Sequence, residues 1–426
     1  MTKSDSQKII LSEDWLATIM GLALILFFLL GIPMAAPSYN WSSFEDLYSK
    51  VFTFKNLVSV FNQFVLIYST SVLAVYFSGK SVKALFKVIA LLFVIAQVAQ
   101  VLAGNSFIKS YNLEAVIFCL ILGLIISHSI NVPEEWRTIL SSEWYVKVGL
   151  VLLGTSVIFS DILKAGSLGL IQAVVVVFSV WYLSYWICRK LKIDDELTFM
   201  LSSAVSICGV SAAIATAGAI KGDSKKLSYV ISLVLIVAIP MMIFMPYIAR
   251  YAGLSGEVTG AWLGGTIDTT GAVVAAGTLA GETALKVSTI VKFSQNVLLG
   301  IAAFAISVYW TYTKNEKAAD EKPSAAMIWN RFPKFVIGFI LASLLFSFVI
   351  QPSTVSSVKD GLKSMQGLWF GLAFTAIGLE TKFSDIFNAG NKKPLYAFLL
   401  AQLLNIAITL VVALILFGDN SFLTQE

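Results

Sequence analysis

Apolar runs of roughly 20 residues recur along the whole chain, and no other feature constrains its fold as strongly. A helix of about 20 residues crosses the hydrocarbon core of a bilayer, and backbone groups in lipid must bond within their own segment. Only 13% of the residues are charged, against about 25% in an average soluble domain. The sequence therefore predicts an all-α polytopic membrane protein. The thirteen expected segments are 15–35, 57–78, 84–103, 112–130, 145–164, 168–188, 196–219, 226–250, 258–281, 287–312, 333–350, 366–383 and 394–418.

The runs predict an N-terminal extension at residues 1–108, with about three transmembrane helices, and a core at 109–418. A polar stretch at 313–332 is expected to be a cytoplasmic linker. No basic tract is interleaved with exposed aromatic residues, so a nucleic-acid partner is not expected. The expected partners are the lipid bilayer and a small molecule or ion, and an oligomer is compatible with the pattern.

Lysine and arginine predict how the chain is oriented in a bacterial-type inner membrane. If all thirteen segments cross, about 19 of the 30 basic residues fall on the N-terminal side, which favours a cytoplasmic N-terminus. If segments 196–219 and 258–281 dip in and return, the split becomes roughly 21 to 9. The sequence leaves both arrangements open.

The chain also repeats itself, because F-S-D-I-x-x-A-G occurs at residues 159–166 and again at 383–390. The same offset of 224 carries segment 112–130 onto 333–350, and 168–188 onto 394–418. An odd number of crossings separates the copies, so they would lie upside down relative to each other. Inverted repeats are typical of secondary transporters, which bind substrate near the midplane where discontinuous helices meet. We expect repeats at about 112–250 and 333–418.

Two segments carry small and hydroxyl-bearing residues where the others have Leu, Ile and Phe: residues 202–220 and 264–277. Close helix packing alone would explain the small residues. Asp268, in the stretch GGTIDTTGAVVAAG, argues for a solute site, because a carboxylate at membrane depth costs several kcal/mol unless it is paired, hydrated or protonated. Glycine and threonine weaken the helix there, which frees backbone groups to bind a solute, and half-helix N-termini attract anions.

Asp268 is expected to take a coupling proton, to bind Na⁺ with threonine oxygens, or to hold an amine of the substrate. Lys292 and Asn296 share one face of the next helix. Lys292 would neutralise Asp268 or meet an anion, or would simply snorkel to the surface. Glu380 is either a further site residue or an interfacial one. The full set of expected substrate- or ion-binding residues is Ser206, Cys208, Gly209, Ser211, Thr266, Asp268, Thr269, Thr270, Lys292, Asn296 and Glu380, and Na⁺ is expected at Asp268, Thr269 and Thr270.

Two other classes of function are disfavoured. A membrane enzyme would need a catalytic motif, and the sequence has no H-E-x-x-H, no P-loop and a single histidine. No catalytic residue, metal site or cofactor other than a coupling ion is expected. A channel or sensor would not require two loosened helices. Saturable flux coupled to an ion gradient separates a transporter from both.

Four stretches, taken together, resemble the YeiH-like family of membrane proteins, which carries the label of sulfate exporters. They are SICGVSAAIA, GGTIDTTGAVVAAG, IVKFSQN and AIGLETKFSDIFNAGNKKPL, and the resemblance covers residues 112–418. It implies an architecture with two broken helices that cross in a core domain. Carried onto this sequence, the breaks fall near Gly209 and near Asp268.

The sequence departs from this family at its polar positions. Many members have a histidine at the position of Asp268, an acid at Thr269, and arginines at Ser156 and Gln295. Basic side chains are therefore missing here and a carboxylate is gained. A bare dianion such as sulfate would favour the opposite change. Either Asp268 serves a coupling cation while helix ends hold an anion, or the solute is a zwitterion or a cation.

Overall fold

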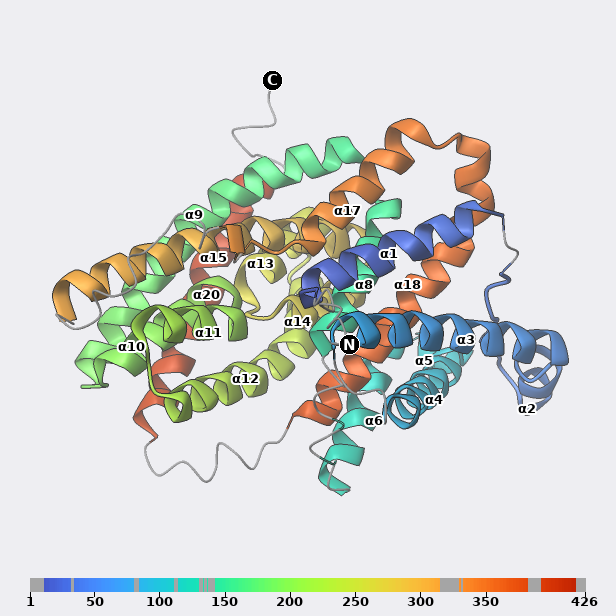
Figure 1. Ribbon diagram of the computed structural model, residues 1–426, viewed down its shortest axis with the longest axis horizontal. Coiled ribbons are helices and arrows are strands. Elements are labelled where there is room, and N and C mark those ends of the chain that lie inside the picture. Colours follow the sequence, from blue (N-terminus) through green and yellow to red (C-terminus); the bar gives the residue numbers. More distant parts are fainter. Residues whose placement is uncertain are drawn as a thin grey trace, which may run out of the picture. The chain divides into compact units, whose positions relative to one another are not determined.

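The computed structural model describes residues 11–31, 34–79, 84–110, 114–129, 133, 136, 142–314, 329–330, 332–381 and 392–418. Regular structure in these ranges is helical, apart from one isolated bridge between Trp41 and Asn105. The chain forms two compact units, which Figure 1 lets the reader follow by colour. Unit 1 comprises Met1–Phe159 with Lys334–Glu380, and unit 2 comprises Ser160–Pro333 with Thr381–Glu426.

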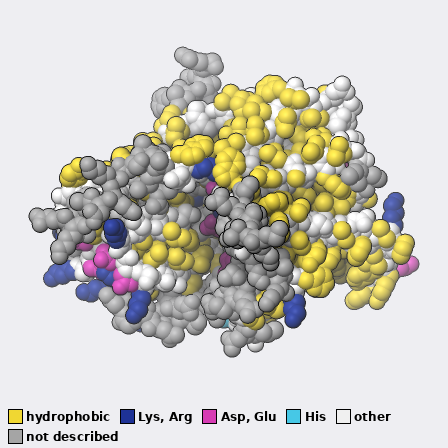
Figure 2. Space-filling model, viewed as in Figure 1, with side chains coloured by type: hydrophobic (Ala, Val, Ile, Leu, Met, Phe, Trp, Pro, Cys, Tyr) yellow, Lys and Arg dark blue, Asp and Glu magenta, His cyan; other side chains and the backbone are white. Residues whose placement is uncertain are grey.

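Six helices in the described residues are long and apolar enough to cross a membrane. Large apolar side chains face outward along them, such as Phe178 and Leu403 with 60% and 63% of their surface exposed. Figure 2 shows apolar side chains over much of the face in view. Exposed apolar surface on this scale requires lipid, which confirms a multi-pass helical membrane protein. The six are α3 (Phe54–Phe77), α4 (Leu85–Ala103), α9 (Phe159–Lys190), α12 (Ser224–Tyr251), α15 (Glu282–Lys314) and α20 (Lys393–Phe417).

Unit 1 is built around α18 (Pro352–Glu380), which packs against α6 (Ala115–Ser129) and α8 (Ser142–Leu153). Gly123 and Gly378 let two backbones touch, since a side chain on Gly123 would meet the Thr375 carbonyl oxygen at 2.6 Å. Its other elements are α1 (Glu13–Leu29), α2 (Phe44–Asp46), η1 (Leu47–Val51), α5 (Ser106–Ser110), η2 (Gly154–Ser156), α17 (Phe335–Leu344) and η4 (Leu345–Val349).

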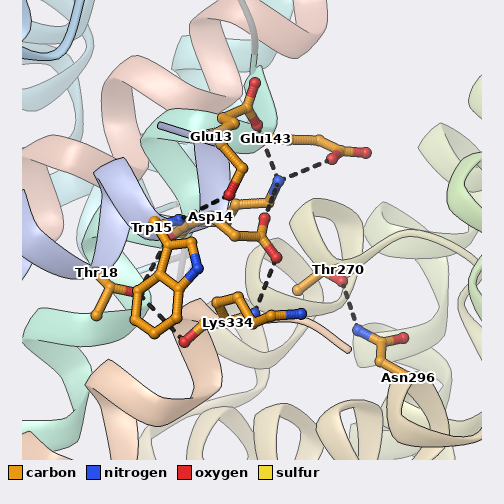
Figure 3. Close-up of polar contacts among 10 residues, drawn as sticks. Glu13, Asp14, Trp15, Thr18, Glu143, Thr270, Asn296 and Lys334 are labelled. Atoms are coloured by element: carbon orange, nitrogen blue, oxygen red, sulfur yellow. Dashed lines mark hydrogen bonds and ion pairs between the residues drawn. The ribbon is translucent and has the colours of Figure 1, made fainter. Parts of the chain in front are cut away.

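A charge cluster joins three helices of unit 1. Lys147 Nζ on α8 lies 2.9 Å from Glu13 Oε1, 2.9 Å from Asp14 Oδ1 and 3.3 Å from Glu143 Oε2. The second oxygen of Asp14 accepts a hydrogen bond from the backbone nitrogen of Lys334, at the start of α17. Figure 3 shows the three carboxylates converging on one lysine. These bonds fix the N-terminal end of α1 within unit 1.

Several segment boundaries differ from the sequence prediction; α18, for example, begins at Pro352, whereas the expected segment was 366–383. Segments 145–164 and 168–188 were expected as two separate spans, but α8 ends at Leu153 and a single helix, α9, runs over residues 159–190. The turn at Gly154–Ser156 ends in Val157, whose backbone is extended at φ −109° and ψ 124°. An extended residue interrupts the hydrogen-bond ladder, whereas hydropathy stays high across it.

The first small-residue segment of unit 2 is a hairpin. It consists of α10 (Asp195–Ser203), the π-helical turn η3 (Ala204–Cys208), Gly209 and α11 (Val210–Ile220). Its two ends lie together, because Lys226 Nζ in the first turn of α12 is 2.7 Å from Asp194 Oδ1 and 3.2 Å from Glu196 Oε2. The chain therefore enters and leaves this hairpin at the same end.

The second small-residue segment, α13 (Gly256–Thr266) and α14 (Thr270–Ala280), also returns to where it starts. A side chain on Gly256 would meet Thr283 Cβ at 2.9 Å, so the start of α13 lies beside the first turn of α15. Each of the two small-residue segments is therefore a hairpin whose ends lie together.

The two hairpins start from opposite ends of α12. The first hairpin ends just before Ser224, and the second begins just after Tyr251. The 28 residues of α12 span about 42 Å at 1.5 Å per residue. Two hairpins based at opposite ends of such a helix point toward each other, which brings their tips to the middle of unit 2.

Candidate functional site

The tips of the two hairpins are in contact at Gly209 and Asp268. Gly209 has φ +59°, a conformation that side chains rarely adopt. A Cβ built on Gly209 would lie 3.0 Å from Asp268 Cβ and 2.6 Å from Val234 Cγ1. Only glycine fits this close approach. We take the region where the two hairpin tips meet as the candidate site, because it contains Asp268.

Two side-chain amides tie the tips together. Gln295 Nε2 on α15 donates to the carbonyl oxygens of Ser206 (2.8 Å) and Gly265 (3.2 Å), one on each hairpin. Asn405 Nδ2 on α20 does the same with Val205 (3.2 Å) and Thr266 (3.1 Å). Carbonyls at the ends of η3 and α13 have no partner within their helices, and these amides satisfy them.

Lys292 lies in the same region and is 1% exposed. Its Nζ donates to the carbonyl oxygen of Ile207 at 2.8 Å and to Gln295 Oε1 at 2.8 Å. It also attracts the Asp268 carboxylate electrostatically. The ammonium group is therefore held inside unit 2 at the negative end of η3, and it does not snorkel to the surface.

Asp268 is buried without a hydrogen-bond partner. Its side chain is 1% exposed, and neither carboxylate oxygen has a hydrogen bond of ordinary geometry. The nearest donor is the Gln402 amide, which interacts with the carboxylate, but its Nε2 points at the Thr266 carbonyl oxygen (3.0 Å) and Met241 Sδ (3.3 Å). A buried carboxylate without a donor is rare in folded proteins and requires an explanation.

The threonines around Asp268 have different tasks. Thr269 caps α14, because its side chain accepts the backbone N–H of Ala272 at 3.2 Å. Thr270 Oγ1 accepts from Asn296 Nδ2 at 3.2 Å, a bond drawn in Figure 3. Thr266 Oγ1 has no hydrogen-bond partner. Of the three hydroxyl oxygens, Thr266 Oγ1 is therefore the one left without a local bond.

The remaining expected residues of the first hairpin lie at its tip. Ser206 Oγ donates to the Ser202 carbonyl oxygen at 2.7 Å within the helix. Cys208 is buried directly before Gly209. Ser211 is half-buried in the first turn of α11, whose N-terminus has no side-chain cap.

Glu380 belongs to unit 1, whereas the other candidate residues belong to unit 2. Its carboxylate accepts from the backbone nitrogen of Ser142 at 3.1 Å and from Ser142 Oγ at 2.7 Å. These bonds place it at the N-terminus of α8, where a carboxylate is favoured by the helix dipole. This contact gives Glu380 a capping task.

The set of site residues predicted from the sequence leaves out three amides of the candidate site, namely Gln295, Gln402 and Asn405. The sequence places Gln295 near the face of Lys292 and Asn296, and it explains Gln402 and Asn405 as contacts between neighbouring helices. A usable signal existed, because Gln402 and Asn405 interrupt an apolar run at a spacing of three, and so lie near one another on one helix face.

The fold defines a class: a polytopic α-helical membrane protein. Its candidate site is the buried polar centre where the two hairpin tips of unit 2 meet. A family described as conserved hypothetical protein 698 matches residues 87–397. The chain belongs to that family, the UPF0324 membrane proteins, which is the YeiH-like group recognised from the sequence motifs.

Individual relatives agree with this assignment. A UPF0324 membrane protein of Rhodopirellula baltica is 40% identical over 348 residues, which cover 80% of this chain and 64% of the relative. One from Nitratidesulfovibrio vulgaris is 39% identical over 339 residues, covering 76% and 58%. The chain thus spans less than two thirds of the length of these relatives. No solved structure matches the chain.

Proposed function

We propose that the protein is a secondary active transporter of a small anionic or zwitterionic solute of the sulfate, sulfonate or carboxylate kind, coupled to H⁺ or Na⁺. One observation carries this proposal: the Asp268 carboxylate is buried between two hairpin tips and has no hydrogen-bond partner. An intramembrane carboxylate of this kind is costly and marks an ion or substrate pathway.

The two ends of the broken segments offer different chemistry. Backbone N–H groups in the first turn of α11 have no side-chain cap, and such an N-terminus attracts anions. The charge of Asp268 beside Gly209 opposes an anion there. A cation bound to Asp268 would remove this repulsion, so the cation and the anion would each strengthen the binding of the other.

The course of two helices supports an inverted repeat in the transport core. Gly265 on α13 contacts both Gln172, from the N-terminal half of α9, and Thr409, from the C-terminal half of α20. The opposite halves, with Ile187 and Phe398, share the apolar cluster around α10. The two helices therefore run in opposite directions, as the repeat of 168–188 onto 394–418 requires.

A cation/proton antiporter-like exchanger is a second candidate, favoured by the electrostatic pairing of Asp268 with Lys292. A membrane-embedded sensor or channel would lack coupled, saturable flux.

We propose that the protein lies in the inner membrane of a bacterial-type cell, with the N-terminus in the cytoplasm, as the positive charges favour.

Uptake into proteoliposomes tests the proposal. Labelled sulfate, a small sulfonate and a carboxylate are supplied under an imposed H⁺ or Na⁺ gradient. We expect at least one solute to accumulate with saturation and gradient dependence, and Asp268→Asn to abolish the gradient dependence. Thr278→Val is the matched control, because the Thr278 hydroxyl bonds only to the Val274 carbonyl within α14. Uptake by the Asp268→Asn protein equal to wild type would refute the role of this residue.

A further inference from the structure

We propose that Asp268, Thr266 and Gln402 form a Na⁺ site at the tip of the second hairpin. The inference rests on the proposed function, because it names the coupling ion of that site. The sequence predicts Thr269 and Thr270 as the Na⁺ ligands, but their hydroxyl oxygens accept local hydrogen bonds. The proposed site contains Thr266 in their place.

Several buried side-chain oxygens of unit 2 have no hydrogen-bond partner. In its described part, the buried side-chain atoms without a partner are all oxygens. The carboxylate and amide oxygens among them can only accept hydrogen bonds, whereas the Ser and Thr hydroxyls can also donate one. The atoms are Gln172 Oε1, Ser184 Oγ, Thr266 Oγ1, Asp268 Oδ1 and Oδ2, Thr289 Oγ1, Asn296 Oδ1 and Gln402 Oε1.

Three of these residues are neighbours. Gln402 donates to the Thr266 carbonyl oxygen at 3.0 Å and is close enough to influence the Asp268 carboxylate. Ile267, between Thr266 and Asp268, is extended at φ −74° and ψ 130° and ends α13 at this point. Each side chain is at most 2% exposed. Asp268, Thr266 and Gln402 therefore bring buried side-chain oxygens without a partner to the tip of the second hairpin.

Na⁺ fits this set better than a proton or a lysine. One proton on Asp268 could join at most two of the oxygens, whereas a hard cation binds several oxygen ligands at once. Lys292 gives two of its three N–H donors to Ile207 and Gln295, and its Nζ makes no hydrogen bond of ordinary geometry to the Asp268 carboxylate. The carboxylate thus remains available to a second cation, as in transporters whose unwound segments hold Na⁺.

Na⁺ binding to the purified full-length protein in lipid nanodiscs tests the site without requiring transport. Isothermal titration with NaCl is compared with KCl and choline chloride at constant ionic strength, and the unfolding temperature is followed in parallel. We expect saturable binding of Na⁺ alone, with a rise in unfolding temperature, because a ligand of the folded state stabilises it.

Thr266→Val is the decisive variant, because it removes one oxygen and leaves the backbone carbonyl that accepts from Gln402 and Asn405. We expect at least tenfold weaker Na⁺ binding for Thr266→Val and none for Asp268→Asn, with Thr278→Val unchanged. Absence of Na⁺-specific binding in the wild type, or wild-type affinity in folded Thr266→Val, overturns the site.

The two proposals fail separately. Uptake that depends on Asp268 and is driven by H⁺ alone, in a protein that binds no Na⁺, removes the Na⁺ site and keeps the transporter. Saturable Na⁺ binding that Thr266→Val weakens, in a protein that accumulates no solute, keeps the Na⁺ site and removes the coupled transport.

Discussion

At the scale of single residues, the candidate site contains a cation that makes two hydrogen bonds and a carboxylate that has none of ordinary geometry. Lys292 bonds to Ile207 and Gln295, whereas Asp268 has only electrostatic attraction to Lys292. A charge held in a dry site depends on its nearest counter-charge, because desolvation penalises every unpaired ion. Replacing one of the two charged residues should therefore change the free energy of unfolding differently when the other has already been replaced.

A double-mutant cycle measures this coupling. Lys292→Met leaves the Ile207 carbonyl and Gln295 Oε1 without a donor, and each orphaned buried group costs about 1–3 kcal/mol. We expect Lys292→Met to lower the free energy of unfolding less when Asp268→Asn is already present. The coupling energy should be about 0.5–3 kcal/mol in Na⁺-free buffer. Denaturant unfolding in detergent provides the free energies. Lys286→Met on the same helix, combined with Asp268→Asn, should give a coupling near zero; equal coupling for both lysines would contradict the pairing.

The sequence singles out Asp268 and Lys292 as candidate site residues because an ionisable residue in an apolar run has few explanations. Asp268 and Lys292 both lie buried near the hairpin tips. Glu380 met the same criterion, but it caps α8 in unit 1. The amides Gln295 and Asn405 were passed over, because a neutral side chain at membrane depth is common between helices. An amide that bridges two hairpins differs from an ordinary one only in its hydrogen-bond partners, and a sequence does not give these.

At the scale of elements, helix existence followed from hydropathy, but the course of the two small-residue segments did not. A helix that crosses and a hairpin that returns have the same apolar composition, and the loop charges changed little between them. Whether the segment continues or folds back is shown by contacts between residues distant in sequence, such as Lys226 with Asp194 and Glu196. The reversal itself needs Gly209, which single-sequence patterns do not separate from a glycine that merely packs.

Gly209→Ala tests this reversal. Its φ of +59° is unfavourable for alanine, and the new Cβ would lie 2.6 Å from Val234 Cγ1. Backbone strain of this kind costs about 1–3 kcal/mol, and the clash adds to it. We expect a lower unfolding temperature and loss of solute uptake.

Gly367→Ala is the matched control for that substitution, because Gly367 lies in α18 with no atom within 4 Å of its added Cβ. Alanine is favoured over glycine inside a helix by about 0.5–1 kcal/mol. The control should therefore leave stability unchanged or slightly raised. Equal unfolding temperatures for Gly209→Ala and wild type would show that the tip does not need this backbone conformation.

At the scale of the whole molecule, the class and the family could be predicted from sequence, because lipid imposes length and polarity on every span. The distribution of Lys and Arg in the sequence hardly decides which side of the membrane each loop faces. Because the first hairpin returns to its starting end, its basic residues lie at one end of α12. Lys225 and Lys226 lie at one end of α12 with Asp194, and Tyr251 lies at the other. The basic end, which also carries Arg189 and Lys190, should be cytoplasmic.

Cysteine accessibility in intact cells decides this sidedness. Lys225 is exposed at the start of α12, and Tyr251 is 96% exposed at its end. The native cysteines are buried, so each new thiol can be followed separately. Treatment with a membrane-impermeant maleimide should label Tyr251→Cys in intact cells and Lys225→Cys only after permeabilisation. Labelling of both positions from outside would mean that α12 does not span the membrane, and the reverse pattern would invert the orientation. Only the reverse pattern would exchange the sides of the membrane on which the two hairpins begin.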